Sequence, residues 1–350
     1  MDNLKLSIII PVYNGEQYIE QCTKSLLNQQ LKQIEIIFIN DGSIDNSKLI
    51  LDKLSKRYSN IRVLHQENKG PGAARNLGIE VAKGEYIGFV DVDDTPKEDM
   101  YYKLYSLSEE YDLDMAVCGF EVIDSSNKIK EIALPKYNKK IYIDKDDIRE
   151  NILIRVIYNG PETLASQWNK IYRKSLLDKY KIRVDEDRMF GEDWLFNQFM
   201  LGKINKIGFI EEPLYRYIRS NNESLASLYL ENAFELFTTS KKFREERIKE
   251  WGLDTQKHMY IDNDNFCKLI YNRVIVNELS NKKDINLREK FINIKNYIQS
   301  DIVQNSAKNS NKQLYARLYC ENRIINVFIK AYFDANIRPS LSKLKRKLRR

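Results

Sequence analysis

About the first third of the chain alternates between two hydrophobic periods, and this alternation limits the fold more than any other feature. Short apolar runs, typical of strands covered on both faces, are separated by longer segments with helical spacing. The expected strands are residues 6–11, 34–40, 61–66, 85–90 and 114–120. The expected helices are residues 15–30, 44–58, 71–83 and 96–111. This order predicts βαβ units, and therefore an α/β fold with a mainly parallel sheet flanked by helices.

Beyond this region the pattern changes, which divides the chain into three parts. Residues 124–148 have a weaker, polar and loop-like pattern, and a mixed stretch follows to about residue 227. Residues 228–337 have mostly helical spacing, and residues 338–350 are strongly basic. We therefore expect an α/β domain over residues 1–227, then a helical C-terminal region and a basic tail.

The net charge of +7 is concentrated at one end of the chain. The tail, RPSLSKLKRKLRR, contains seven basic residues and no acid, and the other 50 basic residues balance the 50 acidic ones. A formally neutral body argues against nucleic acid as the partner. The tail is either an amphipathic segment on an anionic membrane or a solubilising extension. Four scattered cysteines and an N-terminal apolar run too short for a signal peptide predict a reduced, cytoplasmic protein, peripheral at the inner membrane face if the tail binds there.

Four polar loops follow four of the expected strands, at the edge of a parallel sheet where ligands bind. Their sequences are PVYNGE (11–16), NDGSIDNS (40–47), NKGPGAARNLG (68–78) and DVDD (91–94). Taken singly, each has an ordinary explanation as a turn, a helix cap, a glycine-rich loop or a solvated loop. Because all four fall at the same edge, we interpret them as the walls of one crevice.

The DVDD loop places Asp91, Asp93 and Asp94 directly after an apolar strand. Carboxylates this close repel one another and are costly to bury, so the loop requires a positive partner. Carboxylate oxygens suit Mg²⁺ or Mn²⁺, whereas two histidines and scattered cysteines offer no zinc site. The next residues, TPKE (95–98), have the spacing of a helix cap and capping box, so a helix is expected to begin at Pro96.

Together with GEDW (191–194), these loops resemble the ordered signature of glycosyltransferase family two over about residues 7–227. The resemblance implies a GT-A fold and an inverting, metal-dependent hexosyltransferase that uses Mn²⁺ or Mg²⁺. Such an enzyme would move a sugar from a UDP-sugar donor to an acceptor hydroxyl. The bacterial cell-surface type of the family implies a glycan or lipid-linked acceptor, as in capsule or teichoic acid synthesis. The oligomeric state stays open.

The resemblance also implies roles for the three aspartates of DVDD. By its position in the motif, Asp93 is expected to ligate the metal. Asp91 is expected to contact the ribose or the donor sugar. Asp94 either reaches toward the donor sugar or supports the turn.

Residues of the other three loops match donor-binding positions of the family. Asp41 is expected to accept the uracil N–H, while Tyr13 packs on the base and Pro11 shapes the loop. Asn68 and Arg75 match positions that contact base, ribose or phosphate. From the residues alone, core packing remains an alternative for Tyr13 and a surface salt bridge for Arg75.

The GEDW segment is expected to supply the catalytic base. Asp193, which follows Glu192, matches the family position that takes the proton of the acceptor hydroxyl. The structural alternative is a pair of acids favoured by the dipole at a helix N-terminus. Trp194 either stacks on an acceptor sugar or anchors the helix.

Two further segments give weaker predictions for the acceptor and phosphate side. QWNKIYRKSLL (167–177) resembles a segment of bacterial family members, so Trp168, Asn169 and Lys170 are candidates for the acceptor side. Core packing is the alternative for Trp168. PLYRYIRSNNESLAS (213–227) is similar to the segment that follows the base. Its Arg216 and Arg219 are candidates for a phosphate clamp, or they belong to an exposed charged loop.

Two rival functions are considered alongside glycosyl transfer. A nucleotidyltransferase of the same fold would have a glycine-rich, basic loop after the first strand, which PVYNGEQY lacks. A non-catalytic scaffold that binds nucleotide sugars or glycans would keep the fold without turnover. The presence of Asp91, Asp93 and Asp193 favours the enzyme over the scaffold.

Overall fold

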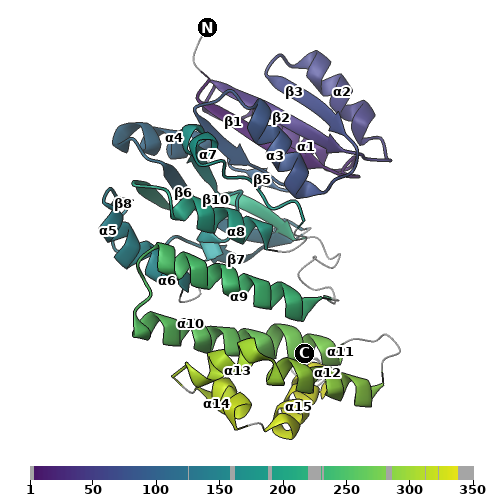
Figure 1. Ribbon diagram of the computed structural model, residues 1–350. Helices are drawn as coiled ribbons and strands as arrows, with labels where there is room; N and C mark the ends of the chain where they lie inside the picture. The colour runs from purple at the N-terminus through teal and green to yellow at the C-terminus, as the bar shows by residue number, and fades with distance from the viewer. Residues whose placement is uncertain are drawn as a thin grey trace. The chain divides into compact units, whose positions relative to one another are not determined.

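The computed structural model describes two compact units, one holding nearly all described residues up to 219 and the other those from 230 on (Figure 1). The described residues are 4–124, 126–157, 162–187, 191–219, 230, 232–280, 286–311, 313–321 and 323–337. The basic tail, residues 338–350, lies outside them. Within the described ranges, no helix combines the length and the apolar character needed to cross a bilayer.

The N-terminal unit is built on a ten-stranded sheet in the order β3-β2-β1-β4-β9-β6-β10-β5, with β7 beside β6 and β8 beside β10. The strands are β1 (Leu6–Val12), β2 (Ile34–Asp41), β3 (Ile61–Gln66), β4 (Tyr86–Phe89), β5 (Thr95–Pro96), β6 (Met115–Asp124), β7 (Ile129–Ala133), β8 (Ile141–Tyr142), β9 (Lys170–Arg173) and β10 (Ile207–Arg219). Strands β3, β2, β1 and β4 run parallel, as do β6 and β10, whereas β9 is antiparallel to β4 and β6. The expected mainly parallel sheet is confirmed.

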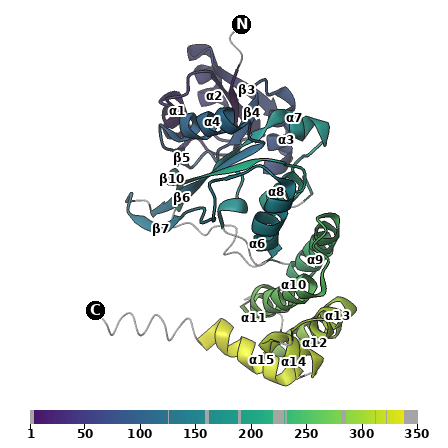
Figure 2. The same ribbon diagram turned by 90° about the vertical axis from the view of Figure 1, so that its left-hand side faces the viewer.

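Helices cover both faces of this sheet. Successive residues of β1 point to opposite sides, and each side packs against helices. The helices are α1 (Ile19–Leu27), α2 (Ser47–Arg57), α3 (Pro71–Val81), α4 (Met100–Tyr111), α5 (Lys145–Ile148), α6 (Ile154–Ile157), α7 (Lys174–Lys179) and α8 (Glu192–Leu201). Ile8 and Ile10 belong to the core that contains residues of α1 and α4. Ile9, on the other face, meets α3 at Gly78. The parallel strands therefore lie between two helical layers (Figure 2). Because they run in the same direction, their carboxyl ends lie at one edge of the sheet.

The expected helix start at Pro96 is wrong. Thr95 and Pro96 form β5, which pairs with Arg216 and Tyr215 of β10, and the helix begins only at Met100. The loop-like prediction for residues 124–148 is also partly wrong. That region contains β7, β8 and α5, because β6 and β10 provide edges to which its short strands can bond.

The C-terminal unit is helical, as expected. Its α-helices are α9 (Ala233–Glu250), α10 (Gln256–Leu269), α11 (Val276–Ser280), α12 (Leu287–Gln299), α13 (Asp301–Lys308), α14 (Leu314–Cys320) and α15 (Ile324–Tyr332). Wider π-helical turns join α10 to α11, at Ile270–Ile275, and extend α15, at Phe333–Ile337.

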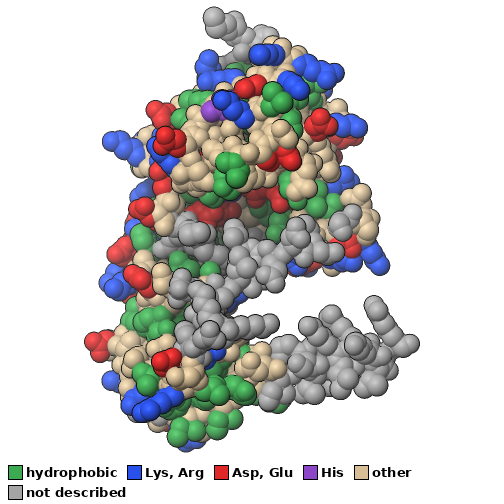
Figure 3. All heavy atoms as spheres, turned by 90° about the vertical axis from the view of Figure 1, so that its right-hand side faces the viewer, with side chains coloured by type: hydrophobic (Ala, Val, Ile, Leu, Met, Phe, Trp, Pro, Cys, Tyr) green, Lys and Arg blue, Asp and Glu red, His purple; other side chains and the backbone are tan. Residues whose placement is uncertain are grey.

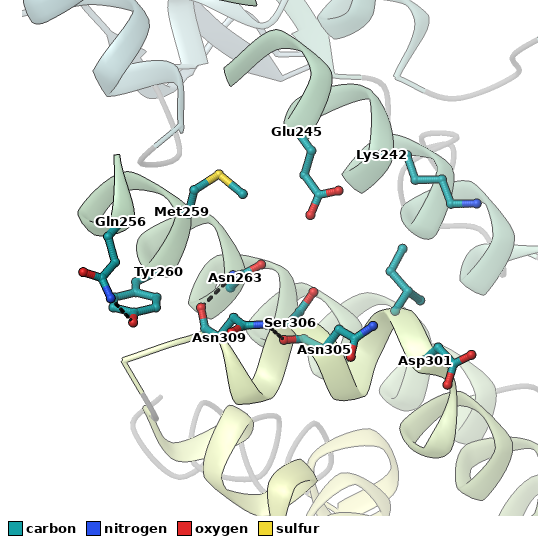
Figure 4. A pocket seen from close by; sticks show the side chains of 11 residues that line it. Lys242, Glu245, Gln256, Met259, Tyr260, Asn263, Asp301, Asn305, Ser306 and Asn309 are labelled. Carbon is teal, nitrogen blue, oxygen red and sulfur yellow. Dashed lines mark hydrogen bonds between the residues drawn. The ribbon is translucent and has the colours of Figure 1, made fainter. Parts of the chain in front are cut away.

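A polar groove of about 690 Å³ lies between α9, α10 and α13 (Figure 4). Its polar side chains bond one another. The Asn263 amide donates to the Asn309 carbonyl at 2.7 Å, and the Gln256 amide donates to the Tyr260 hydroxyl. The first bond ties α10 to the end of α13, whereas the second lies within α10, so an amide of the groove contributes to the packing of the unit.

Gly78 sets how closely α3 approaches the sheet. A Cβ at this position would overlap the Cγ2 of Ile9, which is fully buried and β-branched and so has little freedom to move. We expect Gly78→Ala to lower the free energy of unfolding by roughly 1–3 kcal/mol, although alanine favours helix formation. Urea denaturation would measure the loss. Combined with Ile9→Ala, the effect should be less than additive, and simple additivity would contradict the overlap.

Candidate active site

The loops after β1 and β2 are bound to each other through reciprocal hydrogen bonds. Asn14 has a left-handed conformation with a φ of 50°. Its backbone N–H donates to the Ser43 hydroxyl (3.0 Å), and its side-chain oxygen accepts from the Ile44 N–H (2.9 Å). Pro11 lies near the end of β1, beside Ile39 of β2. The Tyr13 side chain that follows is 51% exposed. Core packing is therefore excluded for Tyr13, and its ring is accessible to a ligand.

Asp41, at the end of β2, is buried and organises the loop before α3. One carboxylate oxygen accepts from the Gln66 side chain at 2.7 Å and from the Lys69 N–H at 2.8 Å. The other accepts from the Gly70 N–H at 2.9 Å. Because Asp41 binds one donor at the end of β3 and two in the loop that follows, it positions the chain that enters α3.

Gly42 brings the same two loops into close contact. Its φ is +70°, and a Cβ there would lie 2.6 Å from the Asn68 backbone nitrogen. Only glycine meets both demands without strain. The Asn68 side chain is exposed, so the contact leaves its amide facing solvent.

Arg75 of α3 is buried and joins the two acidic segments of the sequence. Its guanidinium lies 2.9 Å from Asp91, 3.4 Å from Glu192 and 3.3 Å from Asp193. Burial alone would lower the pKa of Arg75, but the charges of Asp193, Asp91 and Glu192 outweigh it and raise the pKa. The surface salt bridge considered for Arg75 is therefore wrong. The residue is the buried positive partner of acids that are about 100 positions apart.

Asp94 is fully buried and supports the turn between β4 and β5. One oxygen accepts from the Tyr215 hydroxyl at 2.9 Å, and the other from the Ile218 N–H at 2.8 Å. Burial, with the charges of Asp91 and Asp93, raises the pKa of Asp94 well above its usual value. Of the two roles left open for Asp94, these contacts account for the structural one.

Asp93 differs from Asp91 and Asp94, because its carboxylate neither pairs with a cation nor accepts a hydrogen bond from another described residue. Burial, followed by the charge of Asp91, raises the pKa of Asp93 to about 6. A positive charge beside these carboxylates would oppose both effects. The described residues contain no group of three or more His, Cys, Asp or Glu side chains arranged around a metal. Two carboxylates fit an ion that completes its coordination with substrate phosphates and water.

Asp193 lies in the first turn of α8, which is held against the sheet by aromatic packing. Phe196 contacts Phe89 and Tyr172 edge-to-face, at centroid distances of 5.8 and 5.3 Å. The pKa of Asp193 is raised to about 7, chiefly by burial. The charges of Glu192 and Asp91 also raise this pKa, whereas the charge of Arg75 lowers it. The Asp193 Oδ1 atom accepts no hydrogen bond from the described residues. The same oxygen faces the Arg75 guanidinium at 3.3 Å, so its charge is held by an ion pair without a well-aligned hydrogen bond.

Trp168 and Trp194 have different surroundings. Trp168 is largely buried, stacks on Tyr215 at a centroid distance of 4.3 Å and meets Phe120 edge-to-face at 4.8 Å. These contacts account for Trp168 as a core residue. Trp194 is half-buried in the first turn of α8, next to Asp193, so both of its predicted roles stay open.

The two arginines of β10 leave the sheet on opposite faces, since side chains of a strand alternate. Arg216 bonds the carboxylate of Glu121 at 2.9 Å, on the face away from Tyr215. This geometry does not support Arg216 as a phosphate clamp beside Asp94, which the Tyr215 hydroxyl contacts on the other face of the sheet. Arg219 is exposed at the end of β10, on the face that carries Tyr215.

Sequence reasoning missed Tyr215, and it considered Lys170 only as a residue of the acceptor side. The Tyr215 hydroxyl lies 3.3 Å from the Asp91 N–H as well as bonding Asp94, and period-two alternation along β10 was the signal for it. Lys170 is fully buried, and its ammonium donates to the Ser166 carbonyl and to Asn169. Burial lowers the pKa of Lys170 to about 7, against the charge of Asp193.

The acids at this edge of the sheet come from segments far apart in the chain, yet they form one cluster around Arg75. In the space-filling view, acidic side chains gather in a hollow on the surface of the N-terminal unit (Figure 3). The site therefore combines an exposed aromatic ring, an ordered loop pair and carboxylates with raised pKa values.

Comparison with known proteins agrees with this architecture. The sequence profile of Glycosyl transferase family 2 matches residues 7–181. The uncharacterized glycosyltransferase EpsJ of Bacillus subtilis is 37% identical over 64% of this chain and 63% of EpsJ, so the match spans less than two thirds of that relative. The poly(ribitol-phosphate) beta-glucosyltransferase of Bacillus spizizenii is 32% identical over 65% of this chain and 34% of that protein.

Among solved structures, S. aureus TarS 1–349 in complex with UDP-GlcNAc superposes with a TM-score of 0.70 at 21% identity. The superposition covers 94% of this chain and 90% of the TarS chain. It confirms the expected GT-A fold with a helical C-terminal region. The matched profile and the sequence relatives show that the chain belongs to glycosyl transferase family 2.

Proposed function

We propose that the chain transfers a sugar from a UDP-sugar to a hydroxyl of a bacterial cell-surface glycan, with inversion at the anomeric carbon. The contacts of Arg75 carry the proposal, because they join Asp91 of DVDD and Asp193 of GEDW in one site. The names of similar proteins support the donor and the pathway. TarS is described in complex with UDP-GlcNAc, and the Bacillus spizizenii relative is a poly(ribitol-phosphate) beta-glucosyltransferase.

The exposed Tyr13 ring and the buried Asp41 carboxylate support a uracil base at the first two loops. An aromatic ring with half its surface free can stack on the base. The Asp41 oxygens already accept three hydrogen bonds, and a carboxylate has about four lone-pair positions. One position remains for the uracil N–H. Asn68 and Arg75 would face the ribose and phosphates from the neighbouring loop.

Asp93, with Asp91, would hold Mn²⁺ or Mg²⁺, which when bound neutralises the charge of the departing diphosphate. The carboxylates and the diphosphate are all negative, so their approach requires positive charge between them. Arg75 is already engaged by three acids. The raised pKa of Asp93 is consistent with a carboxylate that lacks its cation.

Asp193 would act as the general base for direct displacement. The acceptor oxygen forms a bond to the anomeric carbon while the bond to the diphosphate oxygen breaks, and Asp193 takes the hydroxyl proton. Attack from the face opposite the leaving group inverts the anomeric centre. A pKa of about 7 gives this carboxylate enough basicity to accept a proton near neutral pH.

A panel of nucleotide sugars tests the proposal. The full chain, supplied with Mn²⁺ and a poly(ribitol phosphate) or polysaccharide acceptor, should release UDP from at least one UDP-sugar and should not release GDP from GDP-sugars. Binding of a UDP-sugar without release under every acceptor condition would instead support the scaffold function. Absence of binding to any nucleotide sugar would overturn both.

Asp193→Asn should lower kcat by at least ~10², because the amide cannot take the acceptor proton. Donor affinity, measured by calorimetry, should stay within a few-fold of the original protein. Glu192→Gln is a matched control, since it removes the same charge from a neighbour of Arg75 at nearly the same distance. If both variants lose activity equally, the loss reflects charge around Arg75, and Asp193 is not the base.

The pH dependence follows from the same carboxylate. Because burial raises the pKa of Asp193 to about 7, its basic form is lost as pH falls through that value. We expect kcat/KM for the acceptor to fall roughly tenfold per pH unit below 7 and to level off above about pH 8. The remaining activity of Asp193→Asn should lack this acid limb. An unchanged limb in the variant would assign it to another group.

Asp93→Asn should abolish the dependence of donor binding on Mn²⁺ and lower turnover by at least ~10², while thermal stability is retained. Asp94→Ala is the contrasting variant, because it leaves the Tyr215 hydroxyl and the Ile218 N–H without their acceptor. It should cost about 1–3 kcal/mol of unfolding free energy. If excess chelator leaves the original protein fully active, the metal assignment is wrong.

A further inference from the structure

Helix α15 has two apolar faces, and only one of them is buried in the helical unit. Ile324, Val327 and Ala331 point into the unit and are almost inaccessible. On the other side, Ile325 and Ile329 are 63% and 62% exposed. They are followed on that side by the exposed rings of Tyr332 and Phe333, which gives the spacing i, i+4, i+7, i+8. A continuous apolar stripe therefore faces outward.

Neighbouring α12 widens this stripe into a surface. Phe291 of α12 meets Phe328 of α15 edge-to-face, at a centroid distance of 5.2 Å. A shallow apolar groove of about 460 Å³ lies between the helices, and Leu287 at its rim is 54% exposed. Figure 3 shows hydrophobic side chains gathered on the surface of the helical unit. Apolar patches of this kind mark contact with a partner or a lipid.

The charge around this surface is positive. Helix α12 carries three basic residues and one acid, and Arg288 borders the groove. The sequence that follows α15 and its π-helical turn is the tail 338–350, with seven basic residues and no acid. Exposed apolar side chains beside a dense basic segment match the chemistry of an anionic membrane surface, where each basic residue adds to the attraction.

We propose that the apolar surface of α12 and α15, hereafter the α12/α15 face, docks on an anionic lipid bilayer, with residues 338–350 supplying the electrostatic attraction. Isoleucine, phenylalanine and tyrosine would enter the headgroup region while the basic residues pair with lipid phosphates. The proposal concerns binding alone, so it does not depend on the transferase activity.

Charge favours the anionic bilayer over two other partners for the α12/α15 face, the tail of the same chain and a second copy of the chain. The tail itself is a poor cover for the groove, because it would bring seven positive charges against a helix that is already net positive. A second copy of the chain would bring two such tails toward each other. An anionic bilayer has the opposite charge and an apolar interior, and so it complements both properties of the face.

Co-sedimentation of the full chain with vesicles tests the proposal. The protein should pellet with phosphatidylglycerol–phosphatidylcholine vesicles at low salt and much less with phosphatidylcholine alone. Ile325→Ser combined with Ile329→Ser should weaken partitioning by roughly tenfold or more, because both side chains lose their apolar burial in the lipid. Raising the salt concentration should weaken binding of the original protein by screening the basic residues.

Two controls make the test specific. Leu49→Ser combined with Ile143→Ser removes apolar side chains of similar exposure, 55% and 64%, from the N-terminal unit and should leave binding unchanged. Changing Lys343, Lys345, Arg346 and Lys347 to Gln should remove most of the salt-dependent part. The proposal is overturned if the Ile325/Ile329 variant binds as the control does. It is also overturned if light scattering shows that this variant only separates a dimer while vesicle binding persists.

Discussion

A cluster of carboxylates at the end of an apolar strand requires a buried positive charge, and in this chain Arg75 supplies it. The guanidinium contacts Asp91, Glu192 and Asp193, so one positive charge serves three acids. The balance stays negative, which is why burial can raise the pKa of Asp93 to about 6. This incomplete neutralisation is the basis on which we propose a cation beside Asp93.

The sheet and its ligand edge were predictable because their determinants are local. Continuous apolar runs fix buried parallel strands, and polar loops after them must fall at the carboxyl edge. The errors came from long-range pairing. Thr95 and Pro96 form a strand only because β10, about 120 residues later, offers an antiparallel partner. Thr95 and Pro96 are suited to the start of a helix, but their hydrogen bonds to β10 place them in a strand instead.

The sequence indicated which residues lie at the candidate site, but it did not distinguish the contacts that each of them makes. Three aspartates in one loop look equivalent in the sequence. In the structure, Asp94 accepts hydrogen bonds from Tyr215 and Ile218, and Asp91 forms an ion pair with Arg75. Of the three, only the Asp93 carboxylate has neither an ion pair nor a hydrogen bond from another described residue. Burial and partner geometry decide these roles, and both depend on β10, whose alternation also directs Arg216 away to Glu121.

A helix with two apolar faces needs two apolar surroundings. Sequence alone would place α15 in a core, because both stripes look alike. The structure buries one stripe, through Val327 and Ala331, and leaves Ile325 and Ile329 in water, which is unfavourable for each side chain. The cost persists in the folded chain unless an apolar phase covers that stripe. Since the positive charge of the following tail repels a covering copy of the same chain, an anionic lipid surface resolves both constraints.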